Sequence, residues 1–360
     1  MSFLETFRGH QLPGFDIVGQ RRRWFAFSGA LIALSLVGVL GIRLEFSIDF
    51  EGGALISYPD SRGLTAEDVQ ATLAEFGRSG AEVQVVGGGE ITIRTSSLNE
   101  LGTERTDLLD ALAEQAGSAS EDMSVQDVGP TWGGQISRKA FQGLIIFLVL
   151  VSIYVAFRFE WKMAVAAQAA LAHDLIVTAG IYGLVGREVT PATVIAILTI
   201  LGYSLYDTVV IFDRIKEHTV STAMIAKESY AGVVSISLNE TFMRSVNTSL
   251  ATLLPITALL LFGGTTLKDF AFALFVGVLS STYSSLFVAS PVLAVLKERE
   301  PRYRQVRARI QARQAAGRTA LREVAPEPAV VDAAAARATT RPTPRGRPSG
   351  RRPPAKRKRR

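Results

Sequence analysis

Long uncharged apolar segments alternate with short polar ones along this chain, and the pattern predicts a polytopic membrane protein. The first segment, Trp24–Ile42, has 19 residues without a charge. At about 1.5 Å per residue, such a helix crosses an apolar core of about 30 Å. It exceeds the roughly 7–15 apolar residues of a signal peptide, so we expect it to be retained. Five further segments share this character and bring the expected transmembrane helices to six: 140–157, 163–185, 192–212, 245–262 and 270–296.

The segment between the first two spans, residues 43–137, has the pattern of a small soluble domain. Strand-like stretches and amphipathic helical stretches alternate in the order β-α-β-β-α-β, which is typical of a ferredoxin-like α+β fold. Thr65 and Asp68 have the spacing of a helix-capping pair. The predicted strands cover residues 46–58, 82–86, 90–95 and 123–128, and the predicted helices cover 65–76 and 103–115.

The charge distribution orients the expected spans. The net charge of +6 conceals an acidic segment, 43–137, with 5 Arg against 17 acidic residues. It also conceals a basic tail, 297–360, with 20 Lys and Arg against 5 acidic residues. Because basic loops stay in the cytoplasm, we place residues 1–23, the loop at 158–162, the loop at 213–244 and the tail there, and the acidic domain outside. Arg138 and Lys139, on the outer side, are a local exception.

The tail divides into two parts by composition. Up to Val324 the sequence is compatible with a basic amphipathic extension of the last helix. From residue 325 onward it is rich in Pro, Ala and Arg and lacks core-forming residues, which indicates disorder. Its terminal KRKRR is either a solvated topology anchor or a binding segment for anionic lipid or the ribosome.

The composition argues against several kinds of chemistry. There is no cysteine, and the 3 histidines are scattered along the chain, so we expect no metal site and no cofactor. No P-loop, nucleophile elbow or HExxH motif is present. We therefore expect a protein that is not an enzyme and that takes its energy from a partner or from an ion gradient.

The fourth apolar segment contains an aspartate where a charge is expensive. Asp213 falls at its cytoplasmic end, but Asp207 lies six residues, about 9 Å, deeper. Insertion of an Asp at a helix centre costs roughly 2.5–3.5 kcal/mol, so intramembrane acids usually have a function. Tyr203 lies one turn away. Asp207 is thus either a proton-responsive group, which we favour, or a structural hydrogen-bonding group.

Other polar residues are candidates for the same path. His173 and Asp174 lie near the middle of the third segment, where one could relay protons while the other braces a neighbouring helix. Neighbouring helical residues point about 100° apart, so we do not expect the two to share a face. Arg244, at the start of the fifth segment, either extends to water or pairs with Asp207. Thr248 and other hydroxyl residues of the fifth and sixth segments predict a hydrated seam.

Several stretches together resemble the SecF group of the SecD/SecF protein-export membrane proteins, relatives of the resistance-nodulation-division transporters. The similarity covers roughly residues 15–296 and is most specific in the fourth segment. The stretches that carry it are FSIDFEGG at 46–53, AFRFEW at 156–161, HD at 173–174, GYSLYDTVVIFDR at 202–214 and NETFMRSVNTS at 239–249.

The resemblance implies a function and a site. A SecF-like chain in the bacterial plasma membrane would pair with SecD beside the SecYEG channel. After SecA has pushed an unfolded preprotein, the pair would use the proton gradient to pull it out. The family's proton-responsive Asp and Arg correspond to Asp207 and Arg244, while His173, Asp174 and Asp213 match motifs of less certain role. Membrane lipids are expected contacts, and the choice between H⁺ and Na⁺ stays open.

Three alternatives remain at the level of sequence. The chain could be half of a small-molecule or lipid exporter, because such exporters carry two six-span halves and this chain has one. It could be a scaffold that does not transport and recruits partners through its charged segments. An intramembrane protease is the weakest alternative, because the aspartates lie outside any protease motif.

Overall fold

The structure, a computed structural model, describes residues 14–42, 44–86, 89–220 and 228–324. The predicted tail beyond Val324 and most of the N-terminal segment before Asp16 lie outside these ranges. Contacts divide the chain into a unit ending at Ile310 and a unit beginning at Gln311. The first unit contains the helix bundle and the small domain, and it is the one that positions the candidate site.

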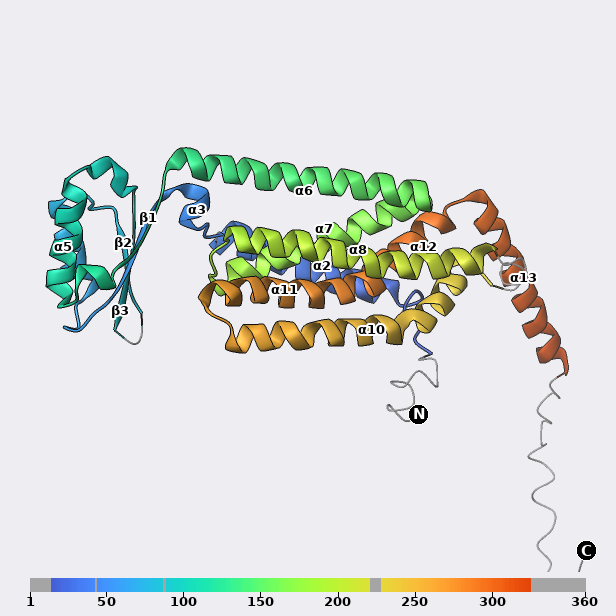
Figure 1. Cartoon of the computed structure of the whole chain (residues 1–360). Helices are drawn as coiled ribbons and strands as arrows, with labels where there is room; N and C mark the ends of the chain where they lie inside the picture. Colours follow the sequence, from blue (N-terminus) through green and yellow to red (C-terminus); the bar gives the residue numbers. More distant parts are fainter. Residues whose placement is uncertain (1–13, 43, 87–88, 221–227, 325–360) are drawn as a thin grey trace, which may run out of the picture. The chain divides into compact units, whose positions relative to one another are not determined.

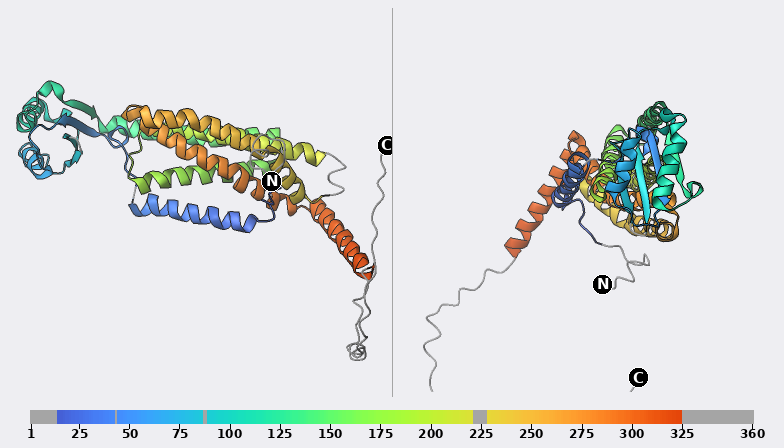
Figure 2. Two further views of the ribbon diagram at one scale, coloured as in Figure 1. Left: turned by 90° about the horizontal axis from the view of Figure 1, so that it is seen from below. Right: turned by 90° about the vertical axis from the view of Figure 1, so that its left-hand side faces the viewer.

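Six helices are long and apolar enough to cross a membrane, and they run side by side in a bundle (Figures 1 and 2). Each predicted span lies within one of them, but the helices extend further into polar sequence than the apolar runs do. Their bounds are Arg21–Val37 (α2) with a π-helical turn Gly38–Ile42 (η1), Pro130–Arg158 (α6), Trp161–Val185 (α7), Pro191–Val220 (α8), Tyr230–Phe262 (α10), and Thr265–Ser284 (α11) continued by a π-helical turn Ser285–Ala289 (η4) and Ser290–Glu298 (α12).

The segment 213–244, which the sequence predicted to be a loop, is largely helical. α8 continues to Val220 and α10 already begins at Tyr230, where the Ser229 hydroxyl accepts a hydrogen bond from the Gly232 amide and caps the helix. In the tail, Pro301–Val324 forms a further helix, α13, rather than a continuation of α12. Hydropathy alone therefore located the spans but not the ends of the helices.

Glycines allow two helices of the bundle to approach each other closely. At the crossing of α2 and α7, a Cβ added to Gly180 would overlap the Ser35 side chain, and one added to Gly183 would overlap the Gly38 backbone. Small residues at such crossings let backbones pack in a membrane, where no hydrophobic effect drives helices together. Gly202 of α8 makes no such close approach: apart from its own helix, no atom of the described residues comes within 4 Å of where its Cβ would stand.

The small domain has a four-stranded antiparallel sheet in the order β2-β3-β1-β4. The order of elements is the predicted β-α-β-β-α-β, and the helices pack through Leu73 and Leu108 on the core of Ile56 and Ile93. The strands are Gly53–Pro59 (β1), Glu82–Val86 (β2), Glu90–Thr95 (β3) and Ser124–Val128 (β4), and the helices are Ala66–Glu75 (α4) and Glu104–Ala116 (α5), with short 3₁₀ turns at Leu98–Leu101 and Ser120–Asp122.

The prediction of one strand over residues 46–58 was wrong for its first half. A short helix, Ile48–Glu51 (α3), precedes β1, and Gly52 and Gly53 follow it with φ angles of 79° and 122°. Residues with a side chain rarely adopt such angles, so the two glycines end the turn and start the strand. The domain also contacts the connection between α7 and α8, through an ion pair of Arg94 with Glu188.

Helix α4 begins with the predicted capping pair. The Asp68 amide donates to the Thr65 hydroxyl at 3.3 Å, and the Thr65 hydroxyl and amide donate to the Asp68 carboxylate at 2.6 and 2.9 Å. These hydrogen bonds hold the pKa of Asp68 below its ordinary value. A depressed carboxyl pKa stabilises the fold above the unfolded pKa of about 3.9, and this contribution is lost as the pH falls through the folded value.

We therefore expect Asp68→Asn to loosen the start of α4 at pH 7 and to have little effect once the pH falls below the lowered pKa of Asp68. The measurement is hydrogen exchange of the α4 amides, compared between wild type and variant at each pH. Glu67→Gln is the matched control, because Glu67 lies in the same helical turn but outside the capping hydrogen bonds. An equal difference at both pH values would contradict the expected linkage.

Candidate functional site

Asp207 lies on the inner face of α8 and is only 9% exposed. One carboxylate oxygen, Oδ1, accepts a hydrogen bond from the Ser245 hydroxyl of α10 at 2.7 Å. The other, Oδ2, is buried and has no hydrogen-bond partner among the described residues. A buried acceptor without a partner costs about 1–3 kcal/mol, and more when it is charged. Asp207 is thus a carboxyl group with an oxygen left available to hold a proton.

Asp174 is the second buried acid of the bundle and is 1% exposed. Unlike Asp207, it is fully engaged: Ser204 and Ser284 donate to its Oδ2 at 2.7 and 2.8 Å, and Ser280 donates to its Oδ1 at 2.7 Å. These donors come from α8 and α11, so one carboxylate on α7 holds three helices together. Hydrogen bonds to an ionised acceptor are roughly twice as strong as neutral ones, which fits a structural role for this cluster.

His173 does contact Asp174, although the sequence argument placed the two side chains on different faces. The His173 Nδ1 lies 3.4 Å from the Asp174 Oδ1, which is longer than a good hydrogen bond. Its Nε2 is buried and has no partner among the described residues. The ring of Tyr283 packs nearby, with its centroid 5.7 Å from that of His173. His173 therefore belongs to the Asp174 cluster, with one ring nitrogen free.

Hydroxyl side chains connect the surroundings of the two acids. Thr208, next to Asp207 in the chain, hydrogen bonds to Ser285 at 2.9 Å, and Ser285 follows the Asp174 partner Ser284. Both serines lie at the start of the π-helical turn η4, whose wider turn lets consecutive residues face the bundle interior. Buried hydroxyls thus form a polar seam between α7, α8 and α11, while the hydrated seam expected from the hydroxyls of the fifth and sixth segments stays a prediction.

Tyr203 extends this seam toward α10. Its hydroxyl lies 3.2 Å from the Ser249 hydroxyl, and Thr282 donates to Ser249 at 2.6 Å. Ser249 in turn donates to the backbone carbonyl of Ser245, the partner of Asp207. The hydroxyl groups thus reach the Asp207 site from two sides.

The structure does not bring Arg244 into an ion pair with Asp207. Its guanidinium is exposed and donates to the Tyr206 hydroxyl at 3.3 Å. Thr248 is half-buried and donates to the Arg244 carbonyl of its own helix at 2.7 Å. Of the predicted pair, only Asp207 lies in the buried seam, while Arg244 adjoins it through the next residue, Ser245.

Arg244 instead lines a charged cavity of about 630 Å³ between α6, α8 and α10. Asp213 lines it as well and pairs with Arg158 at 3.4 Å, both groups being exposed. Arg214 and Glu240 form a further ion pair there. The cavity lies at the end of the bundle where α8 and α10 continue beyond their apolar runs. One of the charged residues that line it, Arg244, directly precedes Ser245 in the chain.

The sequence argument found both buried acids but not the residue that binds Asp207. It treated Ser245 only as the first residue of a span, because nothing in a single sequence shows which hydroxyl of one helix faces a given residue of another. Among the described residues, no group of three or more His, Asp and Glu side chains is arranged to hold a metal ion. The site therefore consists of two buried carboxyl groups surrounded by hydroxyl donors, with one oxygen of Asp207 unpaired among the described residues.

The six apolar helices, the inserted α+β domain and the two buried carboxyls define a multi-pass membrane protein with polar groups in its core. Comparison with known proteins identifies its family. Residues 108–299 match the family described as protein export membrane protein SecD/SecF, C-terminal. The chain belongs to this family.

Named relatives agree with the family match. The protein translocase subunit SecF of Streptomyces coelicolor is 40% identical over 85% of this chain and 83% of its own length. That of Mycobacterium tuberculosis is 41% identical over 83% of this chain and 71% of its own length. The crystal structure of SecDF, a translocon-associated membrane protein, from Thermus thermophilus superposes with a TM-score of 0.70 at 37% identity, covering 80% of this chain. This chain spans only 39% of that SecDF chain.

Proposed function

We propose that this chain is the SecF-type half of a SecD–SecF pair that uses an ion gradient to complete protein export. The observation that carries the proposal is the Asp207 carboxyl, buried in a span with one oxygen bonded to Ser245 and the other unpaired within the described chain. A group of this kind changes its charge when it takes up a proton, and a change of charge in a low-dielectric bundle changes which helix packing is stable. One charge crossing 100 mV supplies roughly 2.3 kcal/mol, so a few protons suffice to bias a sliding chain.

The charged cavity at Arg244 supplies the water-facing end of the proposed path. In the resting arrangement Arg244 bonds to Tyr206, and in a second arrangement it turns inward to meet the ionised Asp207. His173 and Asp174, with the hydroxyls of α8 and α11, support the path on the other side. Arginine remains charged throughout whereas the aspartate does not, so proton binding breaks the pair and proton release restores it.

The proposed topology has both termini in the cytoplasm and the small domain outside. Arg21, Arg22 and Arg23 precede the apolar run of α2, and Arg158 and Lys162 flank the connection between α6 and α7, so basic residues concentrate at one end of the bundle. In this topology the acidic domain contacts the exported chain on the outer side. The chain interacts with the SecYEG channel, and indirectly with SecA, as part of the SecD–SecF complex. We place the protein in the bacterial plasma membrane. Its substrates are unfolded preproteins, and its role is transport rather than hydrolysis.

The likeness to SecDF supports a SecD-like partner for this chain. This chain matches only 39% of the length of the SecDF relative, which is a single, longer chain. The partner contributes the second half of the bundle and further residues of the ion path.

The proposal is tested in inverted membrane vesicles from cells depleted of this chain. We expect the late, SecA-independent part of preprotein translocation to lose its stimulation by an imposed proton gradient and to regain it when the chain is supplied. A sodium gradient tested alongside identifies the coupling ion. Unchanged stimulation in depleted vesicles would refute the proposal, as would a tagged chain that co-purifies with neither a SecD-like half nor the channel.

A further inference from the structure

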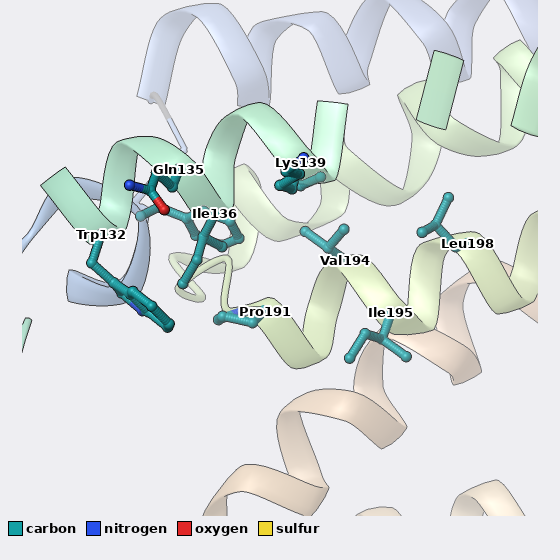
Figure 3. Close-up of a pocket in the computed structure, with 10 residues that line it drawn as sticks. Trp132, Gln135, Ile136, Lys139, Pro191, Val194, Ile195 and Leu198 are labelled. Carbon is teal, nitrogen blue, oxygen red and sulfur yellow. The ribbon is translucent and has the colours of Figure 1, made fainter. Parts of the chain in front are cut away.

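A second cavity, unrelated to the buried acids, lies where α6 and α8 begin. Its volume is about 380 Å³, and side chains of these two helices and of Phe50 line it. Figure 3 shows Trp132, Ile136 and Lys139 on one helix and Val194, Ile195 and Leu198 on the other, with the pocket between them. Both helices are long and apolar enough to cross a membrane, and the pocket lies at the end of the bundle that is joined to the small domain.

The wall that α8 contributes is apolar over two helical turns. Val194, Ile195 and Leu198 follow Pro191 at the spacing that puts them on one helix face, a strip about 10 Å long. Ile195 remains 59% exposed in the described chain. An apolar groove of this length in the plane of a membrane matches part of an acyl chain rather than water or a polar solute.

The α6 wall carries polar groups at the height of the lipid headgroups. The uncharged run of α6 begins at Ala140, immediately after Lys139, so Lys139 marks the edge of the hydrocarbon core. Its side chain is exposed, and it pairs with no carboxylate within the described ranges. Trp132, 61% exposed, and Gln135 lie above it and offer N–H donors, and tryptophan favours the membrane interface.

From this combination we propose that the pocket binds one anionic phospholipid. The Lys139 ammonium reaches outward to the phosphate, which also accepts hydrogen bonds from the N–H groups of Gln135 and Trp132, and one acyl chain follows Val194 to Leu198. The charge of the rim distinguishes this occupant from another protein helix. A helix packed here would bury the ammonium without a partner, which is costly, whereas a phosphate pairs with it at the interface.

Tryptophan fluorescence tests the headgroup preference directly. The chain has 3 tryptophans, and the double variant Trp24→Phe, Trp161→Phe leaves Trp132 in the pocket as the reporter. In bilayers with brominated lipids, we expect brominated phosphatidylglycerol to compete for the site about fivefold better than brominated phosphatidylcholine. Lys139→Gln should bring this ratio to about one.

Lys268→Gln is the matched control, because Lys268 lies near the start of α11 at the same end of the bundle but outside the pocket. It should leave the ratio unchanged. Equal quenching by the two lipids, or a preference that survives Lys139→Gln, would overturn the proposal.

Photocrosslinking in cells tests the occupant in the native assembly. Benzoylphenylalanine placed at Ile195, on the exposed rim of the groove, should yield a phospholipid adduct of the full chain that is detected by mass spectrometry. A crosslink to a protein in place of the lipid adduct would show that a partner subunit covers the pocket and would overturn the proposal.

Discussion

Asp207→Asn is expected to reduce gradient-stimulated export to the level measured without a gradient, while the protein still inserts and assembles. Asparagine has nearly the same size, and its Oδ1 can still accept the Ser245 hydrogen bond seen at 2.7 Å. What it loses is the ability to bind and release a proton at physiological pH. The measurement is the late step of preprotein translocation in vesicles with and without an imposed gradient, together with the amount of variant in the membrane.

Asp213→Asn is the matched control on the same helix. Asp213 is exposed and forms only a surface pair with Arg158, and such pairs contribute about 0–1 kcal/mol. It should retain most of the stimulation. If Asp207→Asn kept full stimulation, the buried carboxyl would be a structural hydrogen-bonding group only, and the ion path would lie elsewhere.

The positions of the spans could be predicted from this sequence, whereas the ends of the helices could not. Apolar runs are dictated by the membrane, so their lengths identify six crossings. Nothing requires a helix to stop where the hydrocarbon ends, however. α10 begins at Tyr230, well before the apolar run at 245, because Ser229 caps it and Tyr230, Val234 and Leu238 of its first turns pack in the core of the bundle.

The candidate site was predictable to a similar extent. Asp207 and Asp174 attract attention in a sequence because charges within apolar runs are rare. The sequence cannot show how helices are rotated about their axes. That rotation decides that Ser245 rather than Arg244 bonds to Asp207, and that three serines surround Asp174.

Asp174→Ala is expected to destabilise the bundle rather than only to slow transport. The substitution removes the acceptor shared by Ser204, Ser280 and Ser284 and leaves buried hydroxyls without it. The loss of this charged, multiply bonded group is on the order of 3 kcal/mol. At roughly 2–4 °C per kcal/mol, the unfolding midpoint of the detergent-solubilised chain should fall by at least about 5 °C, and its abundance in membranes should fall as well.

Asp174→Asn separates the structural role of this residue from a role in proton transfer. The amide oxygen can keep the hydrogen bonds from Ser204 and Ser284, and the NH₂ group then faces Ser280, whose hydroxyl has to reorient, so we expect a loss of only about 1 kcal/mol. If Asp174 only joins helices, export by this variant follows its stability and stays near wild type. If the midpoint is maintained while gradient stimulation disappears, Asp174 belongs to the proton path together with Asp207, and the hydroxyl series through Ser284 and Ser285 is the route between them.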